Sequence, residues 1–214
     1  MIKKEIYLKN VNKKYDTYSW SELNCFYRAF AITFNAFDER YYDLFLLYIS
    51  AYVSYIINGD KNLTFDAGDN TLKYYSNELS KIFNVEIDKI DISSYGNMKK
   101  KVYDLLENGK VVIVPCDLYY LPYSQTYMEL HKRHYLIVKG INYKKNIFYV
   151  LDNMHNDLGS NTEFSDFMIE TDTVYKMCCS FDERFNISTG SKFIWSGILI
   201  YVFRFSRGST LVER

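Results

Sequence analysis

Two histidines and one aspartate near the middle of the sequence have the types and spacing of a catalytic pair. His131 and His134, two of only three histidines in the chain, stand at the start of the apolar run HYLIVKGI. After the polar turn NYKKN, a second apolar run, IFYVLD, ends at Asp152. Two such runs joined by a short polar turn predict a β-hairpin. If the strands pair, Asp152 can hold the imidazole of His134 in the tautomer that a general base requires.

The register of this hairpin follows roughly from its turn. With the turn centred between Lys144 and Lys145, the numbers of paired residues add up to about 289. His134 would then face a residue at about position 155, and Asp152 a residue at about position 137. This is a few residues out of register, an offset that a longer loop or a β-bulge can absorb. The sequence therefore permits the pairing of His134 with Asp152 without fixing it.

Such a pair needs a nucleophile, and Cys25 has the best position among the cysteines. It follows Asn24 at the predicted start of a helix, where the partial positive charge of the helix terminus favours a thiolate over a thiol. The adjacent Cys178 and Cys179 are interpreted as ordinary half-buried thiols. The chain has no C-x-x-C pair and no apolar signal segment, so we expect reduced cysteines and a cytoplasmic protein.

The composition and charge argue against two classes of partner. The 26 basic and 26 acidic residues cancel, so no overall field favours nucleic acid or an anionic membrane surface. The apolar run over residues 41–57 is short for a membrane span and carries Asp43, so it predicts a buried core helix that ends at Gly59. We therefore expect neither nucleic acid nor a membrane as a partner.

Hydrophobic periodicity predicts a chain that is helical in its first half and stranded in its second half. Helices are predicted over residues 26–37, 41–57, 70–83 and 98–108. Strands are predicted over residues 5–8, 85–92, 110–115, 134–141, 147–152 and 198–205. This pattern indicates an α+β fold in which a helical lobe carrying Cys25 packs on an antiparallel sheet carrying His134 and Asp152. Since repeats and linkers are absent, residues 1–206 are expected to form one domain, followed by a polar tail over residues 207–214.

The order of these motifs resembles a known superfamily. A helix-borne Cys25, a long helical stretch and then RHYLIVKGINYKKNIFYVLD are similar to the papain-like superfamily and, within it, to the bacteriocin-processing C39-like peptidases. The segment CDLYYLPYSQTYMELHKRHYLIVKGI resembles more closely the N-terminal domain of the butirosin biosynthesis protein H type. The resemblance extends over roughly residues 20–155 and implies a papain-like (C39-like) fold.

The resemblance also implies a reaction. Members of this type are acyltransferases, and amide-forming relatives act in peptide-like antibiotic pathways such as closthioamide assembly. By this resemblance, an acyl group would move from the phosphopantetheine thioester of an acyl or peptidyl carrier protein to an amine, forming an amide without a metal or other cofactor. Cys25 would be the nucleophile, His134 the general base and acid, and Asp152 the orienting residue of the triad.

The loop LYYLPYSQTY lies where the resemblance is densest. Tyr119, Tyr120, Tyr123 and Tyr127 can line a substrate slot, because tyrosine offers a flat apolar ring with a polar tip. Such a slot would suit an aromatic or pantetheine-linked acyl chain. The alternative is that these rings only pack the loop against the helices.

One feature of papain-like hydrolases is missing from the sequence. These enzymes carry a Gln a few residues before the Cys, whereas the only Gln here is Gln125, in the tyrosine loop. The oxyanion would then rely on the backbone N–H of Cys25 and on one further donor. The candidates for this second oxyanion donor are Asn24, Ser19 and Trp20. The missing Gln argues against an efficient peptidase more than against an acyltransferase. The thioester substrate of an acyltransferase is already activated and needs less stabilisation of the oxyanion.

Three other interpretations of the motifs remain open. The chain can be a C39-like cysteine peptidase that acts on a leader or small peptide, or a non-catalytic papain-like binding domain. His131, His134, His155 and Asp152 can also be drawn as a metal site. Residues three apart on a strand point to opposite faces and no helical H-E-x-x-H occurs, so a metal is not expected.

Overall fold

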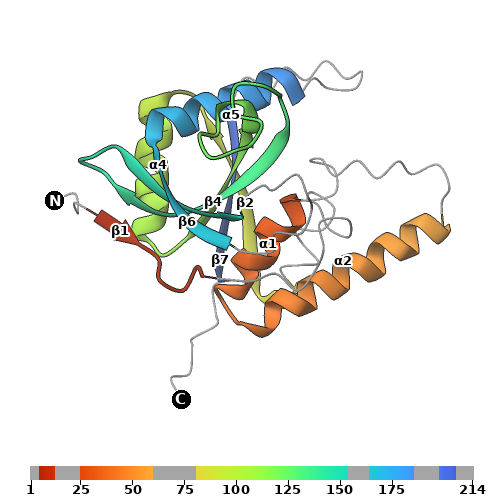
Figure 1. The fold of residues 1–214 in the computed structure, drawn as a ribbon. Helices are drawn as coiled ribbons and strands as arrows, with labels where there is room; N and C mark the ends of the chain where they lie inside the picture. The colour runs from red at the N-terminus through yellow and green to blue at the C-terminus, as the bar shows by residue number, and fades with distance from the viewer. Residues whose placement is uncertain (1–4, 13–24, 60–80, 154–163, 186–197, 206–214) are drawn as a thin grey trace.

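An antiparallel sheet occupies the centre of the molecule, with helices on both of its faces (Figure 1). The computed structural model describes residues 5–12, 25–59, 81–153, 164–185 and 198–205. Within these residues the sheet has seven strands, in the order β2-β7-β3-β4-β5-β6, and β1 pairs with β4. The sequence prediction of an α+β fold with an antiparallel sheet is confirmed.

The strands are β1 (Glu5–Tyr7), β2 (Val85–Ile92), β3 (Val111–Asp117), β4 (Arg133–Asn142), β5 (Ile147–Asn153), β6 (Phe164–Glu170) and β7 (Ile198–Phe205). The helices are α1 (Cys25–Asn35), α2 (Arg40–Gly59), α4 (Tyr95–Glu107) and α5 (Thr171–Phe185), with a short 3-10 helix η1 (Leu118–Tyr120) after β3.

Two hydrophobic cores lie on opposite faces of the sheet. Helices α1 and α2 cover one face, and α4 and α5 cover the other (Figure 1). Because strand residues alternate between faces, β3 contributes Val111 and Ile113 to the α1–α2 core and Val112 and Val114 to the α4–α5 core. The continuous apolar run of β3 is thus explained by burial on both faces.

Most of the predicted elements are confirmed within a few residues, but β6 and α5 were not predicted. Helix α5 carries the signal of a helix, since Val174, Met177, Cys178 and Phe181 are buried at three- and four-residue spacings. Most of the helix predicted over residues 70–83 lies outside the described residues, which resume at residue 81.

The prediction that α2 is a core helix ending at Gly59 is confirmed, although only one face of its described side chains is buried. Tyr42 and Phe45 pack in the core, whereas Leu44 and Leu47 are 50 % and 61 % exposed. The helix is therefore amphipathic along its first turns. In the described part of the chain, no helix combines the length and the apolar character that a membrane span requires.

A β-bulge in β4 decides which side chains of β4 and β5 share a face. Gly140 pairs with Tyr149 and Val138 pairs with Val150, so Lys139 is the extra residue of the bulge. Because side chains alternate along a strand, one extra residue exchanges the two faces of β4 relative to β5. Beyond the bulge, even-numbered residues of both strands face the α4–α5 core.

The bulge leaves no room for a side chain beside β1, and the residue at this position is Gly140. A Cβ atom at residue 140 would lie 2.6 Å from the carbonyl oxygen of Ile6 and 3.0 Å from the Tyr149 ring. We predict that Gly140→Ala lowers the free energy of unfolding by about 1–3 kcal/mol, because β1 or the bulge must move. Urea unfolding monitored by circular dichroism measures this change.

Gly96 provides the matched control, since it lies in α4 and a Cβ atom there meets nothing within 4 Å. Gly96→Ala is expected to be neutral or slightly stabilising, because alanine favours the helix. Equal effects of the two substitutions would contradict this account of the bulge.

Candidate active site

Cys25 is the first residue of α1 that the structure describes, since residues 13–24 lie outside the described ranges. Its side chain is partly exposed, and its Sγ lies 3.9 Å from the carbonyl oxygen of Arg133 at the start of β4. Helix α1 thus brings the sulfur next to the strand that carries His134. That Cys25 marks the start of this helix stays a prediction, because the preceding residues lie outside the described ranges.

His134 and Asp152 form a buried pair. Nε2 of His134 lies 2.8 Å from Oδ1 of Asp152, and the two residues are 1 % and 3 % exposed. Without the bulge at Lys139, the register would place Asp152 on the opposite face of the sheet from His134. The shift of one residue brings the two side chains to the same face, as the sequence analysis allowed.

Cys25 meets this pair at one pocket. Its side chain makes a hydrogen-bonding contact with His134, and because Nε2 of the ring is bound to Asp152, Nδ1 is the nitrogen that remains for the sulfur. Cys25, His134 and Asp152 line one pocket. The other lining residues are Arg28, Ala29, Tyr135, Ile137, Leu151 and Phe164.

The electrostatics of the site favour a charged imidazole. Burial alone would lower the pKa of His134, but the charge of Asp152, the hydrogen bond to Asp152 and the contact with Cys25 raise it from 6.5 to about 10. His134 is therefore an imidazolium at neutral pH, between a carboxylate and a sulfur atom.

Tyr123 holds the second oxygen of Asp152. Its hydroxyl donates a hydrogen bond to Oδ2 at 2.9 Å, and its ring stacks on Phe167 of β6 with 3.8 Å between the ring centroids. Burial and the charge of Asp152 raise the pKa of Tyr123 well above its ordinary value, so its hydroxyl keeps the proton that it donates. Both oxygens of Asp152 are thus fixed, one by His134 and one by Tyr123.

The other tyrosines of the loop lie elsewhere among the described residues. Tyr119 stacks on His131, with 4.2 Å between the ring centroids. Tyr120 lies under the ammonium group of Lys176 on α5, and Tyr127 is 45 % exposed. Of the four rings proposed to line a slot, Tyr123 is the one for which the structure gives a contact with the candidate catalytic residues.

Several predicted site residues lie outside the described residues. These are the three oxyanion candidates Asn24, Ser19 and Trp20, and His155 of the alternative metal site. Sequence analysis also missed Arg28, which is 2 % exposed and lines the pocket. The signal for Arg28 and for Ala29 was their spacing of three and four residues after Cys25, which places them on the same face of α1.

The two histidines of the H-x-x-H motif bind different carboxylates. His134 binds Asp152, whereas Nδ1 of His131 lies 2.6 Å from Oδ2 of Asp117. In the described part of the chain, no group of three or more His, Cys, Asp or Glu side chains is placed to hold a metal ion. The metal interpretation of this motif therefore has no support from the described geometry.

The remaining cysteines differ from Cys25 in their surroundings. Cys116 faces His134 across the β3–β4 ladder but is fully buried, and burial raises the pKa of its thiol. Cys178 is also buried, and its thiol donates to the carbonyl oxygen of Pro115. Cys179 is partly exposed, and burial raises the pKa of its thiol as well. All four cysteines are free thiols.

The chain matches a family model over part of its length. Residues 44–153 match the family described as butirosin biosynthesis protein H, N-terminal. These residues make up just over half of the chain. The match includes His134, Asp152 and the tyrosine loop, and it begins after Cys25. A search of curated proteins finds no match for the chain.

The pair of His134 and Asp152 predicts a characteristic pH dependence. Since the folded pKa of His134 is about 10 and the ordinary value is 6.5, the pair contributes fully to stability below pH 6.5 and loses this contribution as the pH rises through 10. In Asp152→Asn, burial dominates, so we expect the pKa of His134 to fall below its ordinary value. Nuclear magnetic resonance of the imidazole, titrated between pH 5 and about 11, measures both values.

Asp91→Asn on β2 is the matched control for the loss of one acidic side chain. It is expected to leave the titration of His134 unchanged, because Asp91 is paired with Leu199 of β7, away from the pocket. A His134 that titrates near its ordinary value in the wild-type protein would contradict the charged pair.

Proposed function

The chain belongs to the butirosin biosynthesis protein H N-terminal family, and from this premise we propose that it is a cysteine-dependent acyltransferase that forms amides. Family membership implies an enzyme of biosynthesis with acyl-transfer chemistry. The finer proposal is that the acyl donor is the thioester of an acyl or peptidyl carrier protein, and that the acceptor is an amine. The product would belong to a peptide-like antibiotic pathway.

The observation that carries this proposal is the contact of Cys25 with a buried imidazole that Asp152 orients. A cysteine nucleophile needs such an imidazole to accept and return a proton, and it needs a third group to hold the ring. Cys25, His134 and Asp152 come from α1, β4 and β5, which are separate in sequence and meet at one pocket. We propose that these three residues form the catalytic triad and that the fold is papain-like, with residues 1–206 as one domain.

In the first half-reaction, the sulfur of Cys25 attacks the carbonyl carbon of the thioester. The new bond joins this carbon to Sγ, the bond to the carrier sulfur breaks, and the proton of the His134 imidazolium goes to the leaving sulfur. The products are an acylated Cys25, a neutral His134 and the free carrier thiol. The backbone N–H of Cys25, at the positive end of α1, is suited to stabilise the oxyanion of this step.

In the second half-reaction, an unprotonated amine attacks the acyl carbon. The carbon–nitrogen bond forms and the bond to Sγ breaks, while His134 takes up the proton that the nitrogen loses. This restores the thiolate and the imidazolium. The apolar side chains of Ala29, Ile137, Leu151 and Phe164 also line this pocket, and an apolar lining beside the thioester disfavours attack by water.

The lack of a Gln before Cys25 supports acyl transfer over peptide hydrolysis. Removing one oxyanion donor costs roughly 100-fold or more in rate for hydrolases. A thioester is activated and tolerates this loss better than an amide does. The proposed reaction needs no metal or organic cofactor, because Cys25 itself carries the acyl group between donor and acceptor.

Intact-protein mass spectrometry tests this function directly. We expect wild-type protein incubated with a panel of short acyl N-acetylcysteamine thioesters to gain the mass of one acyl group. Addition of 1,3-diaminopropane should remove this mass and release the amide. Cys25→Ala should not be acylated, because the nucleophile is absent.

Cys179→Ala is the matched control, since Cys179 is the other partly exposed cysteine of the described residues. It is expected to be acylated like the wild type. Discharge by water in place of the amine would indicate a hydrolase related to the C39-like peptidases. A wild-type protein that forms no adduct with any thioester would contradict the proposed function.

A further inference from the structure

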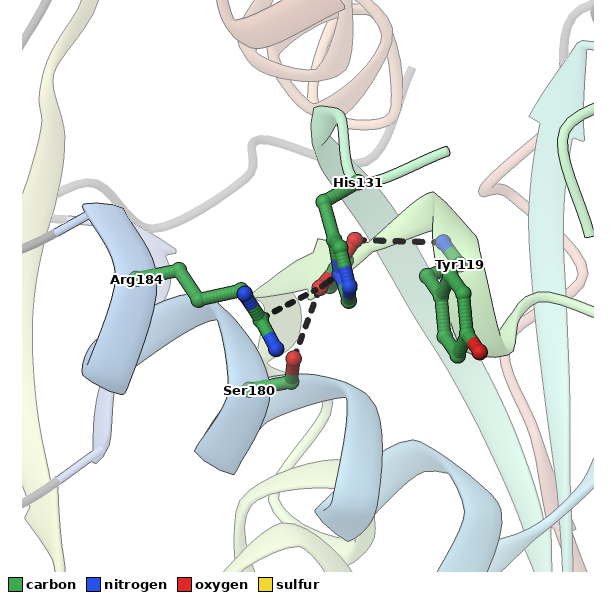
Figure 2. Close-up of polar contacts among 5 residues, drawn as sticks. Tyr119, His131, Ser180 and Arg184 are labelled. Atoms are coloured by element: carbon green, nitrogen blue, oxygen red, sulfur yellow. Dashed lines mark hydrogen bonds and ion pairs between the residues drawn. The ribbon is translucent and has the colours of Figure 1, made fainter. Parts of the chain in front are cut away.

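A second histidine–carboxylate pair lies at the same end of the sheet as the candidate active site. Figure 2 shows Tyr119, His131, Ser180 and Arg184 around one carboxylate, which belongs to Asp117. The side chain of Asp117 is fully buried at the end of β3. Burying a carboxylate costs free energy unless its oxygens accept hydrogen bonds, so the folded chain must provide donors for Asp117.

Three hydrogen bonds keep Asp117 ionised. The hydroxyl of Ser180 on α5 and Nδ1 of His131 each lie 2.6 Å from Oδ2, and the backbone N–H of Tyr119 donates to Oδ1 at 3.1 Å. Burial would raise the pKa of Asp117, but these hydrogen bonds hold it below its ordinary value. Arg184 adds a positive charge, with Nε 4.0 Å from Oδ2.

The ionised carboxylate fixes the orientation of His131. Because a carboxylate only accepts hydrogen bonds, Nδ1 of His131 carries a proton, and in the neutral form of the ring Nε2 is the nitrogen with the lone pair. The ring is stacked on Tyr119 with an angle of 15° between the planes, which limits its rotation. The His131 side chain is 29 % exposed, whereas the imidazole of His134 is buried. His131 is therefore the accessible and oriented imidazole of the two.

One residue of each histidine–aspartate pair, Asp117 and His134, lies in the β3–β4 ladder. Asp117 is opposite Arg133, and the preceding Cys116 is opposite His134. The carbonyl oxygen of Arg133 lies 3.9 Å from Sγ of Cys25. His131 precedes this residue by two positions, so the chain carries it to the end of the sheet where the carbonyl oxygen of Arg133 faces Sγ of Cys25.

The proposed reaction needs one more proton acceptor than the triad provides. An alkyl amine enters as an ammonium ion at neutral pH, and two protons leave its nitrogen before the amide is complete. His134 accepts one of these protons, in the step that restores its imidazolium. The other proton must leave the ammonium before its nitrogen can attack, and Asp152 and Tyr123 are already engaged with each other and with His134.

We propose that His131, oriented by Asp117, is the base that deprotonates the incoming ammonium ion of the acyl acceptor. The inference rests on the proposed acyl transfer and specifies its acceptor as an aliphatic amine that arrives protonated. The nitrogen–hydrogen bond of the ammonium breaks, the proton moves to Nε2 of His131, and the free amine attacks the acyl carbon on Cys25. The exposed imidazolium of His131 then releases the proton to solvent.

The test separates the two half-reactions and compares two acceptors. His131→Gln removes the base but keeps a side-chain donor for Asp117. We expect acylation of Cys25 at the wild-type rate and discharge by 1,3-diaminopropane at pH 7 about 100-fold slower, the lower end of typical general-base contributions. Hydroxylamine is unprotonated at neutral pH, so its discharge rate should stay at the wild-type value. Single-turnover quenched-flow mass spectrometry measures all three rates.

Ser180→Ala is the matched control for a structural role, because it removes the other hydrogen bond to Oδ2 of Asp117 and leaves that of His131. This variant is expected to lose stability without a difference between the two acceptors. Equal slowing with both acceptors in His131→Gln would mean that His131 only anchors the loop, and wild-type rates with both would mean that it has no role. Either result overturns the inference. An absence of acylated Cys25 in the wild type would instead overturn the proposed function itself, before any amine is added.

Discussion

The buried ion pair between His134 and Asp152 imposes the main constraint on this structure. Two charges can be buried only if they lie on the same face of the sheet and in contact, and removing one partner of such a pair typically costs about 3–5 kcal/mol. The bulge at Lys139 meets this condition by shifting β4 one residue relative to β5. The Lys139 ammonium is itself pinned, 2.8 Å from Oδ1 of Asp166 on β6. The end of the sheet that carries the site therefore depends on contacts made further along β4.

The remaining site follows from how the helices cover the sheet. Packing of α1 on one face places its first residue, Cys25, at the edge where β4 begins. On the other face, the loop after β3 brings Tyr123 to the second oxygen of Asp152. Each of the two histidines thus has its own buried aspartate, and the histidines differ in that His134 is buried and His131 is partly exposed. The same end of the sheet therefore holds a buried imidazole paired with one aspartate and an accessible imidazole paired with another.

The sequence predicted the elements of the site better than their contacts. The helix after Asn24 and the hairpin ending at Asp152 were predictable because their apolar patterns are local. The sequence allowed a bulge but did not locate it, because the contacts around Lys139 and Gly140 are with Asp166 and Ile6, which are far away in sequence. Asp117 ends a strand just as Asp152 does, but residue order alone does not tell which histidine each aspartate binds. Tyr123 was singled out for substrate contact, whereas the structure places it behind Asp152.

Selective alkylation of the cysteines tests most directly whether His134 activates Cys25. The protein would be treated with a limiting amount of iodoacetamide at neutral pH, and each cysteine would be quantified by peptide mapping. The account predicts that Cys25 is modified well before Cys179, which is also partly exposed, and that His134→Ala removes this preference. Equal modification of Cys25 and Cys179 in the wild type, or an unchanged preference in His134→Ala, would contradict it.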